Sequence, residues 1–142
     1  MYRKLFKYLY VVILILFLAH PILAGVAPEF KITQGSGDAV NVYVENATDL
    51  GAFEIELSYD KNQIEVISIQ KGELVRNSQR VFSQLGPKID PSGKVTFGFF
   101  SFGNTAGISG SGVLADIQYS GDSSSLKILK VKATDSKGNV LQ

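Results

Sequence analysis

The segment Gly51–Leu74 reads GAFEIELSYDKNQIEVISIQKGEL and contains the clearest structural pattern in the chain. After its first glycine, side chains alternate strictly, and the apolar ones are Phe53, Ile55, Leu57 and Tyr59. A period of two over eight residues predicts a β-strand with one face in a core and the other in water. Residues 59–62 (YDKN) then supply turn-forming side chains. The Ile- and Val-rich residues 64–69 predict a second strand.

The rest of the chain consists of further short strand-like runs separated by turn signals. The predicted strands are residues 30–33, 40–44, 53–59, 64–69, 81–82, 94–102, 113–119, 126–133 and 140–142. With turn signals every eight to twelve residues and no helical period, this pattern predicts an all-β sandwich of eight to nine strands. Residues 86–93 and 103–112 are predicted loops, because both are rich in turn residues. A change of parity between Ile128 and Leu129 predicts a β-bulge.

The first 24 residues differ from the remainder of the chain. Arg3, Lys4 and Lys7 precede an apolar run from Tyr8 to Ala19, which is the pattern of a secretory signal peptide, with cleavage expected after Ala24. The run is shorter than the roughly 20 residues of a membrane-spanning helix. The alternative is an uncleaved leader, which would be the chain's one membrane contact. The predicted domains are therefore a signal peptide, residues 1–24, and a β-sandwich, residues 28–142.

The composition of the chain after the predicted leader excludes several classes of function. After Gly25 it has eleven basic and thirteen acidic residues and no basic run, so we expect no nucleic-acid partner. The chain has no cysteine, and its single histidine, His20, lies in the leader. A nucleophile–histidine site or a zinc site is therefore not expected. Glu54 and Glu56 lie about 6–7 Å apart on one strand, a spacing used by glycosidase pairs. Catalytic pairs flank a cleft, however, so we predict a domain that is not an enzyme and needs no cofactor.

Several motifs resemble those of cohesin domains. They are Gly51 through Asn62, Ile64-Glu65-Val66, Gly72-Glu73-Leu74, Gly93 through Phe97, and Ser109 through Ala115. The resemblance extends from about Lys31 to the end of the chain. It implies a jelly-roll β-sandwich that binds a dockerin-type protein module, secreted or at the cell surface, in an assembly that often degrades polysaccharides. Dockerins carry calcium loops, whereas Asp60, Asn62, Asp135 and Asn139 do not match such a loop. We therefore expect no metal site, and the resemblance implies the receptor half of the pair.

Strand parity and the resemblance together predict the binding face. If Phe53 and Phe97 point into the core, their even-numbered neighbours point outward. The predicted protein-binding residues are Ala52, Glu54, Glu56, Thr96, Phe100, Phe102, Leu114 and Asp116. At positions 52 and 54 the resemblance implies a polar and an acidic residue, and Ala52 departs from it. Outward Phe100 and Phe102 predict an apolar docking surface. The alternative is that a loop within residues 79–89 covers both rings.

Two other functions remain open from the residues alone. A carbohydrate-binding module usually stacks sugars on exposed Trp or Tyr, but the chain has no Trp, and Tyr43 is the one tyrosine that alternation places outward. A structural cell-surface domain without a dedicated ligand is the other alternative. Asn46-Ala47-Thr48 is a glycosylation sequon, which predicts Asn46 as a modification site in an exported loop.

Overall fold

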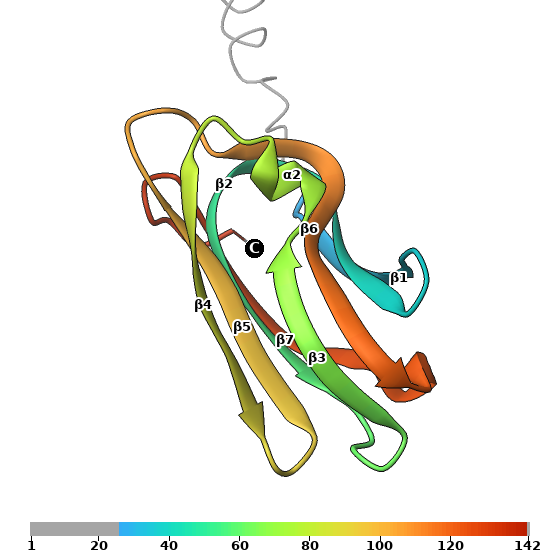
Figure 1. Cartoon of the computed structure of the whole chain (residues 1–142). Coiled ribbons are helices and arrows are strands. Elements are labelled where there is room, and N and C mark those ends of the chain that lie inside the picture. Colours follow the sequence, from blue (N-terminus) through green and yellow to red (C-terminus); the bar gives the residue numbers. More distant parts are fainter. Residues whose placement is uncertain (1–25, 142) are drawn as a thin grey trace, which may run out of the picture.

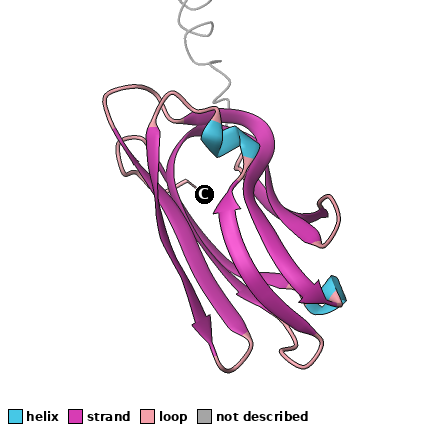
Figure 2. Ribbon diagram, in the orientation of Figure 1, coloured by secondary structure: helices cyan, strands magenta, loops and turns pink. Residues whose placement is uncertain are grey.

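The computed structural model describes residues 26–141, which form seven β-strands and two short helices (Figures 1 and 2). The strands are β1 (Glu29–Gln34), β2 (Ala39–Ser58), β3 (Ile64–Lys71), β4 (Val81–Asp90), β5 (Lys94–Phe102), β6 (Ile108–Gly121) and β7 (Lys127–Asp135). The α-helix α2 (Glu73–Arg76) precedes β4, and the 3-10 helix η1 (Ser123–Ser125) precedes β7. Across this part of the chain, no helix has the length and apolar character to cross a bilayer. The predicted leader, residues 1–24, lies outside the described residues.

The strands form two layers that share the long strand β2 (Figure 1). The first half of β2 pairs with β1 and β6, and β3 extends this layer beyond β6. The second half of β2 pairs with β5 and β7, and β4 extends this layer beyond β5. All these pairs are antiparallel. The prediction of an all-β sandwich is confirmed.

The bend that moves β2 from one layer to the other lies between Asn46 and Asp49. Both residues adopt a positive φ, 57° and 55°, a conformation that Asn and Asp tolerate better than most other residues. Asp49 accepts hydrogen bonds from the Gly107 N–H and the Ser136 hydroxyl, and the Ser136 N–H donates to the Asp49 carbonyl oxygen. The bend is thereby tied to the segments that precede β6 and follow β7.

The core lies between the two layers and is built from the strand faces that alternation predicts. Phe53, Ile55 and Leu57 are at most 4 % exposed. Their partners across β5 are Phe99, Phe97 and Val95, in that order, and these are also buried. The rings of Phe53 and Phe99 lie 5.4 Å apart between centroids, in a tilted arrangement. The predicted inward parity of these two strands is therefore confirmed.

The strand number differs from the predicted eight to nine because two predicted strands are continuous and one is nearly absent. Residues 40–44 and 53–59 both belong to β2, since its bend does not interrupt the pairing with β6 for more than a few residues. At the C-terminal end, Val140 forms a single bridge to Thr134. Seven strands remain within residues 26–141.

Two predicted loops are partly strands. β4 includes residues 86–90, and β6 begins at Ile108. In β4 the register shifts between Leu85 and Lys88, so Gly86 and Pro87 form an irregularity. Proline has no N–H to donate to a neighbouring strand, so within a sheet it is tolerated at irregularities and in edge strands such as β4. The predicted bulge in β7 is confirmed, because the register with β2 shifts between Ile128 and Lys130.

Candidate protein-binding face

The solvent side of the layer β7–β2–β5–β4 carries most of the predicted binding residues. We refer to it as the outer face. It comprises the outward side chains of Ala52–Ser58 in β2, of β4, of β5 and of Lys127–Thr134 in β7. Three rows of directly opposed residues cross it in the order β7, β2, β5, β4: Thr134, Ala52, Phe100, Ser83; Lys132, Glu54, Gly98, Leu85; and Lys130, Glu56, Thr96, Lys88.

An apolar corner of the outer face lies where β5 ends beside β4. Phe100 and Phe102 meet edge to face with ring centroids 5.0 Å apart, a favourable aromatic geometry. Phe102 is 64 % exposed, and its register partner Val81 is 74 % exposed. Leu85 adds a third side chain, 54 % exposed. We refer to Val81, Leu85, Phe100 and Phe102 as the apolar corner.

The alternative that a loop covers the two rings is wrong. Residues 81–90 form β4, which pairs edge to edge with β5 and therefore lies beside the rings instead of over them. Figure 1 shows β4 as the outermost strand next to β5. A contiguous exposed apolar patch on a small domain is a common mark of an interaction site.

A buried arginine that the sequence did not reveal supports this corner from behind. Arg80 is 7 % exposed, and its Nε donates to the Ser101 hydroxyl at 2.8 Å. Its Nη1 donates to the carbonyl oxygens of Gly103, at 3.0 Å, and Thr105. Ser101 in turn donates to the Gly51 carbonyl oxygen at 2.6 Å. The residues on both sides of Phe102 are thus anchored, which limits the motion of its backbone.

Lysines from β7 and β5 surround the two glutamates of β2. Lys132 Nζ lies 2.6 Å from a Glu54 carboxylate oxygen, and Lys94 Nζ lies 3.4 Å from one of Glu56. The hydrogen bond to Glu54 raises the pKa of the Lys132 ammonium. These pairs are partly exposed, so they contribute little to stability. They nevertheless set the charge pattern of the outer face, and Lys130 and Lys132 were missed because the sequence does not show that β7 pairs with β2.

The centre of the outer face is shallow. Glu54 and Leu85 both pair in register with Gly98, and they line a depression together with Ala52, Phe100, Lys132 and Thr134. Gly98 cannot carry a side chain without moving β2, because an added Cβ would lie 2.6 Å from the Phe53 carbonyl oxygen. The face therefore offers an open surface for a complementary ridge.

Two predicted binding residues do not belong to this face. Leu114 is completely buried, because the register between β2 and β6 shifts beside it and turns its side chain into the core. Asp116 is partly exposed but lies in the other layer, where it faces Asn41 of β2 and Gln70 of β3 and forms an ion pair with Arg76 at 3.1 Å. The expectation that both share the face of Phe100 is wrong, since it assumed uninterrupted alternation and a common layer.

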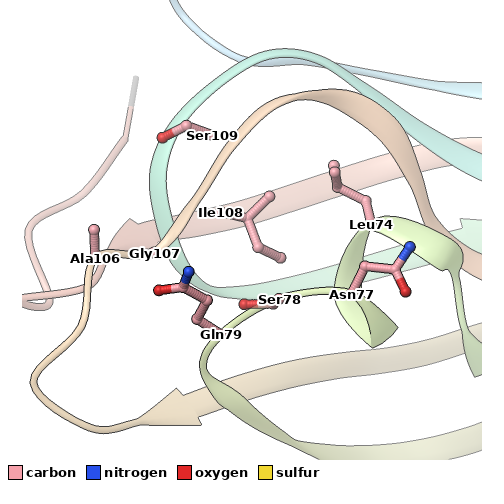
Figure 3. A pocket seen from close by; sticks show the side chains of 8 residues that line it. All are labelled: Leu74, Asn77, Ser78, Gln79, Ala106, Gly107, Ile108 and Ser109. Atoms are coloured by element: carbon pink, nitrogen blue, oxygen red, sulfur yellow. The ribbon is translucent and has the colours of Figure 1, made fainter.

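A separate pocket lies at the end of the sandwich, between the segment after α2 and the start of β6 (Figure 3). Its lining residues are uncharged: Leu74, Asn77, Ser78, Gln79, Ala106, Gly107, Ile108 and Ser109. Arg80 bonds both segments that form its walls. The pocket offers amide and hydroxyl groups but no nucleophile with a base.

The other candidate positions lie in turns. Within residues 26–141, no group of three or more His, Cys, Asp or Glu side chains could hold a metal ion. Asp60 accepts from the Asn62 N–H, and Asp135 accepts from the Lys137 and Asn139 N–H groups. Asn46 is exposed at the bend of β2. Its glycosylation stays a prediction.

Comparison with protein families identifies the class to which this chain belongs. The family profile of the cohesin domain matches residues 31–140, and the chain belongs to the cohesin family. A search of curated protein sequences found no significant match.

Solved cohesin structures share the fold at low sequence identity. A non-cellulosomal cohesin from the archaeon Archaeoglobus fulgidus is 24 % identical, with a TM-score of 0.62, and the match covers 82 % of this chain and 84 % of that one. The sixth cohesin of Acetivibrio cellulolyticus scaffoldin B, solved with a Cel5 dockerin mutant, is 20 % identical, with a TM-score of 0.65 and coverage of 82 % and 92 %. The Clostridium thermocellum Coh-OlpC–Doc435 complex is 16 % identical, with a TM-score of 0.63 and coverage of 86 % and 91 %.

Proposed function

We propose that this chain is an exported, non-catalytic cohesin module that binds a dockerin-type protein module through its outer face. The observation that carries the proposal is the apolar corner, in which Val81, Leu85 and Phe102 are exposed and Phe100 is half-buried. Arg80 anchors the backbone of this corner, and the charged residues of the outer face lie on one side of it. Protein interfaces usually combine an apolar patch, in which aromatic side chains are enriched, with polar and charged residues next to it. Two of the structures similar to this chain are described as cohesin–dockerin complexes, which supports the choice of partner class.

The proposed partner is a folded module, for which an interface of standard size is expected. A standard interface buries about 800 Å² on each side, and the large aromatic side chains near its centre usually provide most of the binding energy. Phe100 and Phe102 are therefore the expected anchors, and Glu54, Glu56 and Thr96 are expected to fix the register of the partner. Ala52 leaves space beside Phe100 in the same row.

We expect no catalytic role for the glutamate pair. Glu54 and Glu56 are on one strand, and each is paired with a lysine. A carboxylate pair that cleaves a glycosidic bond needs one group protonated and the two groups on opposite sides of the substrate. A sugar-binding function also lacks its usual support, since the aromatic residues of the outer face are phenylalanines. The location of the protein, secreted or at the cell surface, rests on the leader.

The test is capture of a partner from the secreted proteins of the source organism by the immobilised domain. We expect recovery of a protein that carries paired calcium-loop helices, and loss of capture by Phe100→Ala plus Phe102→Ala. The control is Ile67→Ala in β3, because Ile67 is also 64 % exposed but belongs to the other layer. Retention on an insoluble polysaccharide without any protein partner would instead support a carbohydrate-binding module. Unfolding of the double variant, measured by circular dichroism, would place the rings in the core.

A further inference from the structure

The outer face has a positive charge excess on a domain that is negative as a whole. Residues 26–142 contain eleven basic and thirteen acidic side chains. The outer face ends at the row in which Ser58 lies between Lys94 and Lys127. Up to and including this row, the face carries five lysines and three carboxylates: Lys88, Lys94, Lys127, Lys130 and Lys132, and Glu54, Glu56 and Asp90. The rest of the domain is correspondingly more acidic. The outer face thus carries the opposite sign to its surroundings.

Internal ion pairs leave part of this charge available. Glu54 and Glu56 are engaged by Lys132 and Lys94. Among residues 26–141, Lys88 and Lys130 form no ion pair within 4.0 Å. They belong to one row, at opposite edges of the face, with Glu56 and Thr96 between them. A partner that lies across this row meets an exposed ammonium group on each side.

The positions of the lysines and of the apolar corner match the dimensions of one helix. Phe102 follows Thr96 by six positions along β5, which is about 20 Å of strand or about 14 residues of helix. The three strand spacings from β7 to β4 amount to about 14 Å, slightly more than the diameter of a helix, about 10–12 Å. A helix along β2 and β5 would place one end on the apolar corner and the other between Lys88 and Lys130.

We propose that the surface of the partner that docks here is an acidic amphipathic helix. This inference rests on the proposed function and adds its chemistry. The apolar ridge of the helix contacts Phe100 and Phe102, and carboxylates on its two flanks meet Lys130 and Lys88. Charge complementarity selects the partner by attraction of acidic helices and by repulsion of basic ones.

The test compares two stapled 18-residue helical peptides with the same leucine and phenylalanine ridge. One carries glutamates on both flanks and the other lysines, and fluorescence anisotropy measures both dissociation constants at low salt. We expect the acidic peptide to bind at least about tenfold more tightly, since several exposed charge contacts change sign. The difference should shrink at about 0.5 M salt, where screening is strong.

Variants of the domain distinguish specific docking from simple charge attraction. Lys88→Glu plus Lys130→Glu should reverse the preference, whereas Lys61→Glu plus Lys137→Glu, which changes the net charge equally outside the outer face, should preserve it. Phe100→Ala plus Phe102→Ala should weaken both peptides.

Equal binding of the two peptides, or tighter binding of the basic one, would overturn the inference and leave the capture of a dockerin-type partner intact as a separate result. Failure of both peptides to bind at about 1 mM would also overturn it. Binding of polygalacturonate that depends on the lysines but not on the phenylalanines would assign the charge to an acidic polysaccharide. Failure of the unaltered domain to capture any protein with paired calcium-loop helices would instead refute the proposed function.

Discussion

Arg80 is buried, and its hydrogen bonds hold the backbone on both sides of the exposed Phe102. Its guanidinium group bonds a side chain of β5 and two carbonyl groups of the following loop. Arginine provides several donors in a fixed geometry, so it can hold a loop that has few apolar contacts of its own. Phe102 projects from this anchored region.

Replacing Arg80 should affect both stability and binding. We expect Arg80→Met to lower the free energy of unfolding by about 1.5–3 kcal/mol, because hydrogen bonds from a charged group are lost. It should also weaken capture of the partner, since the backbone at Phe102 is released. Urea denaturation and binding assays measure the two effects. Arg76→Met is the matched control: Arg76 is exposed, and its loss should cost about 1 kcal/mol or less. Equal effects of the two variants would contradict the structural role of Arg80.

Asp49 fixes a different feature, the bend of β2. Hydrogen bonds from Gly107 and Ser136 hold the pKa of its carboxyl below the ordinary value. A carboxyl group with a depressed folded-state pKa contributes stability above its unfolded pKa of about 3.9. That contribution disappears as the pH falls through the folded-state pKa.

We therefore expect Asp49→Asn to lower the melting temperature at pH 7 and to flatten its decline between about pH 5 and pH 2. Asparagine tolerates the positive φ of this position, so the substitution tests the charge and not the backbone. Melting curves across this pH range provide the measurement, with the exposed Asp38→Asn as control. An unchanged acid dependence would show that the other low-pKa carboxyls, Asp90, Asp122 and Asp135, account for it.

At the scale of elements, β2 organises the domain because, among the strands of residues 26–141, it alone belongs to both layers. Its second half lies between β5 and β7, so its outward residues form the middle of the outer face. β4 and β7 then contribute the two sides. β4 brings Val81, Leu85 and Lys88 beside β5, and β7 brings Lys130 and Lys132 beside β2. The proposed binding surface therefore draws on four strands, of which β4 and β5 are neighbours in sequence, whereas β2 and β7 come from distant parts of the chain.

The two faces of β5 predict how replacing Phe100 and Phe102 by alanine affects stability. They lie on one strand and share one face, so replacing them removes the two aromatic rings of the apolar corner without reaching the core, where Phe97 and Phe99 are buried. The double variant should consequently keep its melting temperature within a few degrees of the parent. A large fall in melting temperature would contradict the separation of the two faces of β5.

For the whole molecule, the leader predicts the route by which the binding face reaches its partner. We expect the exported protein to begin at Gly25, because cleavage after Ala24 removes the basic and apolar leader. Expression of the full chain in a secreting bacterium, followed by mass spectrometry of the exported protein, tests this. A full-length chain in the membrane fraction would show that the leader is kept as an anchor. Expression without residues 1–24 is the control and should leave the domain inside the cell.

The charge of the whole domain gives the outer face a further role. Residue counts make the face positive and the rest of the domain negative, so we expect an acidic partner to be attracted to this face and repelled by the others. Such a pattern increases association rates more than it increases affinity, and salt weakens it. We therefore expect charge to orient the proposed partner before the apolar contacts form.

The amino-acid sequence by itself determined the all-β class, the family resemblance and the inward and outward faces of residues 52–58 and 94–102, because alternation is a local property of a strand. Tertiary structure alone decided which strands became neighbours. It placed Lys130 and Lys132 beside the predicted glutamates of β2, and Val81 and Leu85 beside the β5 strand that carries the predicted phenylalanines. It also buried Leu114 through a register shift and moved Asp116 to the other layer. Pairing between distant strands depends on the packing of the whole core, and no local period in the sequence reports it.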